Sequence, residues 1–466
     1  MASIAILGCG RVGLVSAVCF AELGHEVSCF DNNPAVVRAF REGRFAIREN
    51  HLSDLFARHR RTRLHFVTDL AAAVERSETI FVAVGTPQRE GGDADISQVE
   101  EVARMLGPLL KTRKLIVEKS TVPVLTHRWI ERILQLNGAR PDCIEVASNP
   151  EFVREGSAIT DWLYPERIVL GTVSESAAKR LRELYSPLEN GTYRTQLDAV
   201  PPPPGAPLRP RMIVTDPSSA ELIKYASNSF LAAKISFIDA VANLCDSVGA
   251  DIDEVCEGVG TDARIGQQFL RPGIGFGGSG FAKDLTAFGH MLAEFGQHAG
   301  FFEEVERINR DQRSMFLGKI RKALWTIRGK KLAILGLAYK GGTDDIRDSA
   351  AIEIAHQLAQ EGAYLKAYDP AAMDDAAKVL TDEKVTFARS AYEAAEGCEA
   401  VIVLTDWPEF RALDLDMLCQ SLSYPIVIDG RNLFDPEEMV RHGLMYCSIG
   451  RPDAVPNRRR FTAAPQ

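Results

Sequence analysis

The sequence predicts an α/β protein with two doubly wound domains joined by a long central helix. Strand, glycine turn, helix and second strand follow one another in the opening stretch, "IAILGCGRVGLVSAVCFAELGHEVSCFD". The same order returns in "KKLAILGLAYKGGTDDIRDSAAIEIAHQLAQEGAYLKAYDP". Between them, "PSSAELIKYASNSFLAAKISFIDAVANLCDSVG" has the pattern of one helix that begins at Pro217 and Ser218 and ends at Gly249. Two strand and helix units therefore flank one helical connector.

Length and charge point to a multidomain protein that acts on small molecules. A chain of 466 residues exceeds what one core usually organises. We predict domains at 1–205, 206–325 and 326–466. The net charge of −9 argues against nucleic acid as a partner, because phosphate contacts need a basic face. A small anionic ligand stays possible, since a few local cations suffice to bind it.

Neither a membrane segment nor a metal site is expected. The apolar N-terminus lacks a basic start and is interpreted as the first strand. Lys234 and Asp239 interrupt the apolar part of the central helix well short of a membrane span. Nine cysteines without a CxxC pair favour neither zinc nor a disulfide framework. These thiols fit a reducing cytoplasm, where most of them would be core residues.

The opening glycine turn has the spacing of a dinucleotide-binding fingerprint. Gly8, Gly10 and Gly13 form GxGxxG, and Asp31 closes the second strand at the required distance. The glycines let a pyrophosphate approach the helix N-terminus, where unpaired N–H groups favour negative charge. Asp31 would bond the ribose hydroxyls and repel a 2′-phosphate. We therefore predict a Rossmann-like domain that binds NAD rather than NADP.

Polar residues follow the other predicted strands, at the edge where ligands bind in such sheets. The runs "TIFVAVGTP", "KLIVEKSTVP" and "CIEVASNPEF" continue the first domain, and "AVIVLTDWPEF" and "PIVIDGRN" continue the second. The second domain lacks GxGxxG before its own acid, Asp369, so a different ligand or none is expected there. Lys224 and Asn228 share one face of the connector helix, as a functional pair or a merely solvated one. The proline-rich "VPPPPGAPLRP" is predicted to be an exposed loop.

Several short stretches, in order along nearly the whole chain, are similar to one known family. They are "EKSTVPV", "NPEFVREG", "PERIVLG", "AELIKYASNSFLAAKISF", "DARIG", "GFGGSGFAKD", "ILGLAYKGGTDDIRDS" and "DGRN". Together they resemble the UDP-glucose and GDP-mannose dehydrogenases. The resemblance implies an NAD-binding domain, a helical connector at the core of a homodimer, and a C-terminal domain that holds a nucleotide sugar. It also implies oxidation of the sugar C6 alcohol in two hydride transfers, for polysaccharide biosynthesis.

The resemblance also implies the site residues, position by position. Its catalytic shell falls on Thr121, Glu151, Glu155, Lys224, Asn228 and Asp284. Its cofactor contacts fall on Gly8, Gly10, Val12, Gly13, Asp31, Thr86, Thr121, Glu155, Lys283 and Arg347. Its substrate contacts fall on Phe152, Val153, Arg154, Lys224, Asn228, Arg264, Phe269, Gly275, Phe276, Gly277, Gly278, Lys340 and Arg431. Arg264 matches an arginine that reaches the substrate of the neighbouring subunit, and no metal is implied.

Each of these groups has a sensible chemical role. A hydride leaves C6 only as its hydroxyl loses a proton, which Asp284, Lys224 or a water held by Thr121 could accept. Lys224 and Asn228 would stabilise the oxygen on which charge develops. Lys340 and Arg431 suit a diphosphate, and the nucleotide supplies binding energy that positions C6.

The stretch "GFGGSGFAKD" departs from the family pattern at the nucleophile. The family has a cysteine that attacks the C6 aldehyde where this chain has Gly280, and a proline where it has Ala282. An aldehyde has no hydride to give until something adds to its carbonyl. We therefore expect a two-electron enzyme that releases the 6-aldehyde. Ser279 stands beside the cysteine in the family too, so it is interpreted as a loop residue.

Three other outcomes stay open. In one, the aldehyde hydrate donates the second hydride, with Glu155 or Asp284 orienting the water. In another, the chain is a nucleotide-sugar binding or regulatory protein without catalysis. In the last, Cys245 or Cys256 replaces the missing thiol, although a structural role is expected for both. UDP-glucose is the default substrate, and a UDP-N-acetyl sugar or a GDP sugar are the alternatives, because Gly341 and Gly342 also depart from the family.

Overall fold

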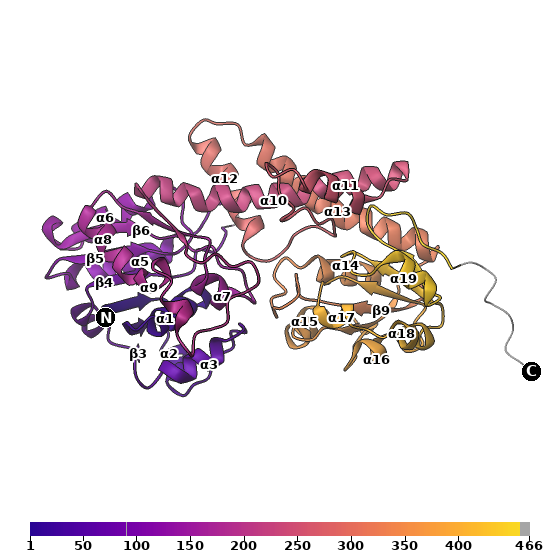
Figure 1. Cartoon of the computed structure of the whole chain (residues 1–466), viewed down its shortest axis with the longest axis horizontal. Helices are drawn as coiled ribbons and strands as arrows, with labels where there is room; N and C mark the ends of the chain where they lie inside the picture. The colour runs from indigo at the N-terminus through magenta and orange to yellow at the C-terminus, as the bar shows by residue number, and fades with distance from the viewer. Residues whose placement is uncertain (90, 457–466) are drawn as a thin grey trace, which may run out of the picture. The chain divides into compact units, whose positions relative to one another are not determined.

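The chain forms two compact units in the computed structural model, which describes residues 1–89 and 91–456 (Figure 1). The first unit is Met1–Ser227 with His290–Gln297, and the second is Asn228–Gly289 with His298–Gln466. Both are α/β units built on a doubly wound sheet, and the predicted fold class is confirmed. The three domain boundaries stay a prediction, and residues 457–466 of the predicted third domain lie outside the described residues.

The first unit is built on an eight-stranded sheet. Its strands are β1 (Ser3–Leu7), β2 (Glu26–Phe30), β3 (Leu64–Val67), β4 (Thr79–Val82), β5 (Lys114–Glu118), β6 (Ile144–Ser148), β7 (Arg167–Gly171) and β8 (Arg211–Thr215). They lie in the order β3-β2-β1-β4-β5-β6-β7-β8. All neighbours pair in parallel except β6 and β7. Strands such as β4 and β5 are buried along their whole length, which explains their continuous apolar runs.

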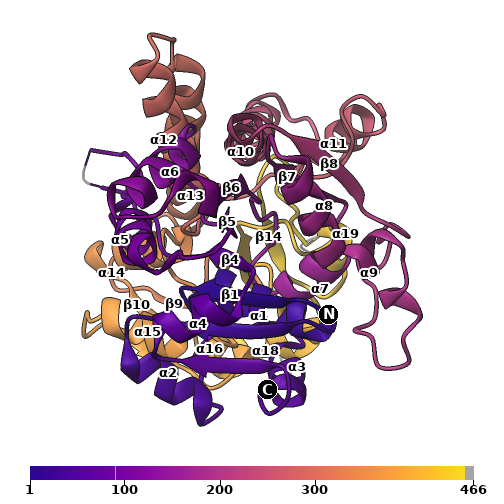
Figure 2. The ribbon, with the colours of Figure 1, turned by 90° about the vertical axis from the view of Figure 1, so that its left-hand side faces the viewer.

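Helices cover both faces of this sheet. They are α1 (Arg11–Glu22), α2 (Pro34–Arg41), α3 (Leu52–His59), α4 (Leu70–Arg76), α5 (Ser97–Leu106), α6 (Thr126–Leu136), α7 (Ala158–Leu163), α8 (Glu175–Leu184) and α9 (Ser186–Glu189), with short 3-10 turns at Gly107–Leu109, Pro141–Cys143 and Tyr193–Thr195. Ile4 and Ile6 of β1 join the core beneath α1, α3, α7 and α8. Ala5 and Leu7 join the core beneath α4, α5 and α6. Figure 2 shows α5 and α6 on one side of the sheet and α7 and α8 on the other.

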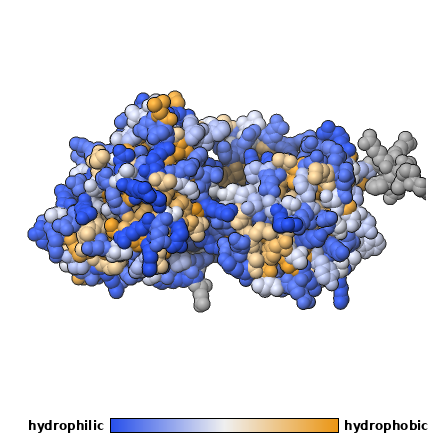
Figure 3. Space-filling model, turned by 90° about the horizontal axis from the view of Figure 1, so that it is seen from below, coloured by the Kyte–Doolittle hydropathy of each residue, from blue (hydrophilic) through white to orange (hydrophobic). Residues whose placement is uncertain are grey.

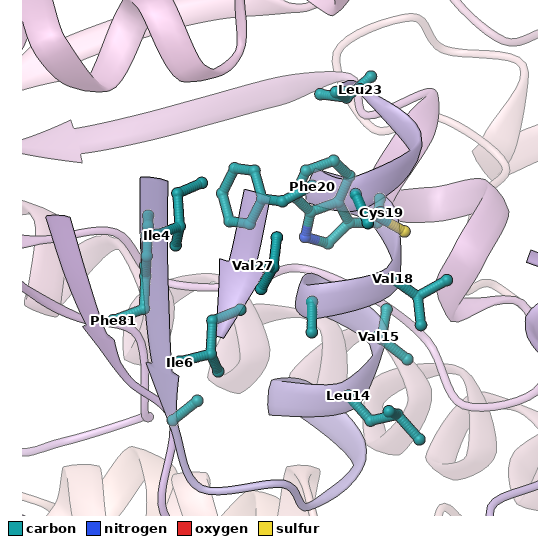
Figure 4. Close-up of a cluster of buried hydrophobic side chains, with 14 of the residues drawn as sticks. Ile4, Ile6, Leu14, Val15, Val18, Cys19, Phe20, Leu23, Val27 and Phe81 are labelled. Atoms are coloured by element: carbon teal, nitrogen blue, oxygen red, sulfur yellow. The ribbon is translucent and has the colours of Figure 1, made fainter. Parts of the chain in front are cut away.

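The packing of α1 on the sheet holds the opening glycine turn in place. Phe20 of α1 is fully buried, with its ring edge-on to Trp162 at a centroid distance of 4.9 Å and tilted against Phe81 at 5.0 Å. Figure 4 shows Phe20 among Ile4, Val27 and Phe81 of three neighbouring strands. Because α1 is anchored along its length, its N-terminus is fixed against the end of β1.

The second unit is built on a six-stranded, all-parallel sheet in the order β11-β10-β9-β12-β13-β14. Its strands are β9 (Lys331–Leu335), β10 (Tyr364–Tyr368), β11 (Val385–Phe387), β12 (Ala400–Val403), β13 (Ile426–Asp429) and β14 (Met445–Cys447). Its helices are α14 (Ala350–Gln360), α15 (Met373–Val379), α16 (Ala391–Ala395), α17 (Pro408–Arg411), α18 (Leu415–Ser421) and α19 (Pro436–Arg441). Alternate residues of β9 again enter two cores, one on each face.

The predicted connector is one helix, α10, that runs from Pro217 to Val248 over 32 residues. It is followed by α11 (Ile252–Gly260), α12 (Phe281–Glu294) and α13 (Gly300–Leu324). None of the helices in the described part of the chain is long and apolar enough to cross a membrane.

The remaining sequence expectations about the surface and the thiols are also met. Residues 201–210 form neither helix nor strand and are mostly exposed, as the proline-rich composition predicts. All nine cysteines are free, and seven of them are buried. Figure 3 shows that hydrophilic residues cover most of the face it displays.

Candidate active site

The three glycines of the opening turn each meet a different steric demand. Gly8 has φ of +97°, and a Cβ there would lie 2.6 Å from the carbonyl oxygen of Ala83. A Cβ at Gly13 would lie 1.9 Å from the carbonyl oxygen of Gly8, so the helix packs directly on the turn. A Cβ at Gly10 would meet no described heavy atom within 4 Å. The middle position is therefore open for a pyrophosphate, as the fingerprint requires.

Asp31 lies against this turn. Its carboxylate accepts hydrogen bonds from the backbone N–H groups of Cys9 at 2.9 Å and Asn33 at 2.9 Å. Val12 is the second residue of α1, next to the helix N-terminus where a phosphate would bind. The carboxylate is partly exposed and keeps acceptor capacity for ribose hydroxyls. These residues fit NAD.

The matching acid of the second unit is used differently. Asp369 is 1 % exposed, and its Oδ2 accepts from the backbone N–H groups of Leu337 and Ala338 and from Nε1 of Trp407. Its Oδ1 accepts from two further backbone N–H groups. A carboxylate that is saturated by its own domain has no capacity for a ribose, so the second unit does not repeat the dinucleotide site.

The ends of β4, β5 and β6 bring several predicted residues to one edge of the first sheet. The hydroxyl of Thr86 donates to the carbonyl of Thr121 at 2.8 Å and thereby links the ends of β4 and β5. Glu155 lies 3.6 Å from Nε of Arg11, the first residue of α1. Carboxyl ends of parallel strands form the ligand edge of such sheets, so this placement agrees with the predicted roles.

Glu151 and Lys224 form a closely packed ion pair. Nζ of Lys224 lies 2.9 Å from Oε1 of Glu151, and the side chains are 6 % and 13 % exposed. The backbone N–H of Val153 donates to the other carboxylate oxygen at 2.7 Å. Burial opposes ionisation of Glu151, but the charge and hydrogen bond of Lys224 outweigh it and lower the pKa of the carboxyl. Glu151 is therefore ionised at neutral pH.

Phe152 and Arg154, which follow Glu151 in the sequence, each contact a charged side chain. The guanidinium of Arg167 lies over the Phe152 ring at 4.0 Å, and Nζ of Lys224 lies 5.5 Å from the same ring. Arg154 forms a two-point ion pair with Asp161, at 2.7 Å and 2.9 Å. The loop after β6 is thus held by two cations near its aromatic ring and by the Arg154–Asp161 ion pair.

Asn228 and Asp284 meet in the second unit. Nδ2 of Asn228 donates to Oδ2 of Asp284 at 2.6 Å, and Nζ of Lys283 lies 2.8 Å from Oδ1. Asp284 is only 2 % exposed. Its backbone N–H donates to the carbonyl of Gly280 at 3.0 Å, which makes Gly280 the residue that begins the first turn of α12. Gly280, where the family resemblance implies a cysteine, therefore lies one helical turn from the predicted base.

The glycine loop before α12 is packed too tightly for side chains at three positions. A Cβ at Gly275 would lie 2.4 Å from Oδ1 of Asn309, one at Gly277 would lie 2.4 Å from the carbonyl oxygen of Asp348, and one at Gly278 would lie 2.7 Å from the Tyr339 ring. Gly275 and Gly278 also have positive φ. At Gly280, in contrast, a Cβ would meet no heavy atom of the described residues within 4 Å. Close packing thus explains the first glycines but not Gly280.

Buried polar side chains hold this loop. The amide of Asn309 pairs with both N–H and carbonyl of Phe276, at 2.7 Å and 3.1 Å. Arg431 donates to the carbonyls of Gly275, Tyr339 and Leu404 at 3.0, 3.1 and 2.9 Å. Arg431, predicted to bind substrate, therefore also fixes the loop that carries other predicted substrate contacts.

The remaining predicted contacts of the second unit lie on its loops. Nζ of Lys340 is 5.8 Å from the ring of Tyr339. Arg347 bonds Asp345 within the same loop at 2.9 Å. Arg264 is paired with Asp262 near the surface, and Phe269 has a φ of +66°. The roles of these residues toward a ligand stay predictions.

The structure sorts the predicted catalytic shell into two groups. Thr121, Glu151, Glu155 and Lys224 belong to the first unit, and Asn228 and Asp284 belong to the second. Sequence reasoning missed Lys119 and Asn149, which lie beside this shell inside two of the quoted motifs, and it missed Asn309 beneath the glycine loop. The motifs that contain Lys119 and Asn149 were a weak signal, and Asn309 lies in no quoted motif. The burial of all three residues depends on the fold and cannot be read from the neighbouring sequence. No group of three His, Cys, Asp or Glu side chains suited to a metal occurs in residues 1–89 and 91–456.

A complete dinucleotide turn, an acid at the end of β2 and charged pairs along the carboxyl edge define the class of NAD-dependent oxidoreductases with a Rossmann-like domain. Comparison with known families identifies the particular group. The NAD binding domain of the UDP-glucose/GDP-mannose dehydrogenase family matches residues 2–189, its central domain matches 218–311, and its UDP binding domain matches 333–436. The chain belongs to this family of NAD-dependent nucleotide-sugar dehydrogenases.

Individual relatives agree with this assignment. UDP-glucose 6-dehydrogenases of Bacillus subtilis and Rhizobium meliloti are each 42 % identical, over 97 % of this chain and 94 % and 100 % of the relatives. A solved UDP-glucose dehydrogenase from Pyrobaculum islandicum is 36 % identical, with a TM-score of 0.84 over 97 % of this chain and 98 % of that one. A UDP-D-ManNAc dehydrogenase from Pyrococcus horikoshii is 27 % identical, with a TM-score of 0.80 over 96 % of this chain and 99 % of that one.

Proposed function

We propose that this chain oxidises the C6 alcohol of a UDP-glucose-like nucleotide sugar and releases the 6-aldehyde. The observation that carries the proposal is Gly280, which stands where the family resemblance places a cysteine nucleophile and which has open space where a side chain would lie. The first oxidation needs no such nucleophile, whereas in the second a nucleophile must first add to the aldehyde carbonyl.

The residues of the shell suit the first oxidation. NAD bound at the Gly8 turn supplies the hydride acceptor. Asp284, held by Asn228 and Lys283, is an acceptor for the hydroxyl proton, either directly or through a water. Lys224, paired with Glu151, supplies positive charge for the oxygen of the forming carbonyl.

Neither alternative cysteine supports the second oxidation. Cys245 lies 17 residues beyond Asn228 on α10 (228 to 245), roughly 25 Å from it by the rise of an α-helix. It is buried in the core beneath α14, and burial raises the pKa of its thiol. Burial also raises the pKa of Cys256 to about 11. Both thiols are therefore protonated, and a thiol is not a good nucleophile. Cys245 is also distant from Asp284, the neighbour of Asn228.

UDP-glucose is the substrate that we propose first. The match of the UDP binding domain to residues 333–436 and the UDP-glucose 6-dehydrogenases at 42 % identity support it. The likeness to a solved UDP-D-ManNAc dehydrogenase makes a UDP-N-acetyl sugar the first alternative to test.

We further propose that the chain is a cytoplasmic homodimer that pairs along α10. An apolar stripe on that helix supports this: Phe230, Phe237, Leu244 and Val248 are 66, 55, 61 and 67 % exposed. They recur at intervals of seven, seven and four residues, so they share one face. The nine free cysteines support the reducing compartment. Phe237→Asp is expected to shift the protein to a monomer in sedimentation, and an unchanged mass would refute the pairing.

The count of NADH formed per sugar consumed tests the proposed activity. With excess NAD, about one NADH per UDP-glucose is expected, and hydroxylamine is expected to trap a carbonyl product. A count near two would replace the aldehyde with oxidation through its hydrate. No NADH with UDP-glucose, UDP-N-acetyl sugars or GDP sugars would overturn the proposal in favour of a binding protein.

A further inference from the structure

A buried lysine outside the predicted shell ties two neighbouring strands together at the ligand edge. Lys119 follows β5 and Asn149 follows β6, and the last residues of these strands, Glu118 and Ser148, lie side by side in register. Nζ of Lys119 donates to Oδ1 of Asn149 at 3.1 Å and to its carbonyl oxygen at 3.3 Å. The lysine is only 3 % exposed.

Asn149 makes hydrogen bonds through both its side chain and its backbone. Its Oδ1 also accepts from the hydroxyl of Tyr185 at 2.6 Å, its Nδ2 donates to the carbonyl of Val169 at 2.8 Å, and its backbone N–H donates to the carbonyl of Glu118 at 2.8 Å. Glu151 is two residues further along the chain. A fixed Asn149 therefore limits where the backbone of Glu151 can lie.

The charges around Lys119 come from Glu118, Glu151 and Lys224, with the Cys19 thiol on α1. Burial, and then the charge of Glu221, raise the pKa of Glu118 well above its usual range. Glu151 is ionised, as described above. The ionised carboxylate of Glu151 thus pairs with Lys224 directly and also acts on Lys119 through its charge.

We propose that Lys119 is a positioning residue for the Glu151–Lys224 ion pair, which it places by anchoring Asn149 to the end of β5. Its charge also competes with Lys224 for Glu151 and so keeps positive charge available for an oxyanion. The inference rests on the proposed function, because it concerns the same reaction site.

Lys114 provides a matched control on the same strand. Its Nζ is likewise buried and donates to carbonyl oxygens, of Glu75 at 3.1 Å and Ser77 at 2.7 Å, but it lies at the opposite end of β5. Lys119→Met is expected to lower kcat for UDP-glucose oxidation about 10-fold to 100-fold, in the range seen when a supporting hydrogen bond is removed, with KM within about twofold. Lys114→Met is expected to lower stability and leave kcat within about twofold.

The pH dependence of kcat distinguishes positioning from mere structural support. Burial is the main cause that lowers the pKa of Lys119 to about 8. Above that pH the charge is lost, so kcat is expected to fall as the pH rises, with a break near pH 8, in the wild type and in Lys114→Met. In Lys119→Met this break is expected to be absent. A break that persists in Lys119→Met would overturn the proposed role of its charge.

A double-mutant cycle with Glu151→Gln completes the test. If Lys119 acts through Glu151, the effect of Lys119→Met on kcat should depend on Glu151. The fold-change that Lys119→Met causes in the Glu151→Gln variant is expected to be at least fivefold smaller than the fold-change it causes in the wild type. The same cycle measured by denaturant unfolding needs no activity, so it decides the inference even if no substrate is turned over and the proposed function fails. Additive effects in both measurements would overturn the inference. Lys119→Gln replaces Lys119→Met if that variant does not fold.

Discussion

Replacing Gly280 with cysteine is expected to convert a two-electron oxidation into a four-electron one. The backbone accepts the change, because Gly280 has no positive φ and a Cβ there meets no described heavy atom within 4 Å. The cost in folding free energy should be within about 0.5 kcal/mol, as for other substitutions that neither clash nor lose a contact. The variant therefore tests chemistry rather than folding.

The position of the new thiol at the N-terminus of α12 should lower its pKa and so make it a better nucleophile. Gly280 immediately precedes α12, which runs for 14 residues, and thiols at helix N-termini have lowered pKa values. A drop from about 8.5 to about 7.5 would raise the thiolate fraction at pH 7.5 from about one tenth to about one half. The thiolate would add to the aldehyde carbonyl, and the resulting hemithioacetal would have a hydride to give to NAD. The thioester that this leaves would be cleaved by water to the carboxylate and the free thiol.

The assay is the number of NADH formed per UDP-glucose consumed, with the product identified chromatographically. We expect about one for the wild type and about two for Gly280→Cys, with loss of the carbonyl trapped by hydroxylamine. Gly280→Ser is the matched control, since it fills the same space with a much weaker nucleophile and should leave the count at one. A folded, active Gly280→Cys that still yields one NADH would refute the reasoning and show that the surrounding shell no longer supports the second step.

Three further predictions follow from single side chains. Asp31→Arg should raise KM for NAD at least about tenfold and improve use of NADP, measured by initial rates, because the ribose acceptor is lost and a 2′-phosphate is no longer repelled. Gly278→Ala should lower the free energy of unfolding by about 2 kcal/mol, because φ is +84° and the Tyr339 ring lies 2.7 Å from the new Cβ, whereas Gly280→Ala should be nearly neutral; equal effects in urea titration would contradict this. The folded state holds Lys119 at a pKa of about 8 against 10.5 for a free lysine, so the unfolded chain binds more protons between these values. The stability of the wild type relative to Lys119→Met should therefore rise with pH across that window, by up to about 3 kcal/mol, and a flat or falling difference would speak against the buried charge.

Motifs that depend on neighbouring residues were predictable. The GxGxxG spacing and Asp31 predicted the first turn, because the conformational demands at Gly8 and the close approach at Gly13 are local properties of one strand, turn and helix. Pro217 and Gly249 predicted the limits of α10 to within a residue, because helix starts and stops depend on a few adjacent residues. The roles assigned to site residues by family resemblance stay predictions.

Long-range packing decided the rest. Nothing near Lys119 in sequence reveals that its ammonium group is buried against Asn149, since β5 and β6 become neighbours only in the folded sheet. Likewise Asp31 and Asp369 both follow the second strand of their domains, yet only the fold shows that Asp369 is saturated by backbone N–H groups and an indole while Asp31 is not. The sequence by itself thus determined the elements and the cofactor turn. Burial and charge pairing, and so which buried groups are ionised, came only from tertiary structure, because desolvation and Coulomb interactions depend on distances between segments that are remote in the chain.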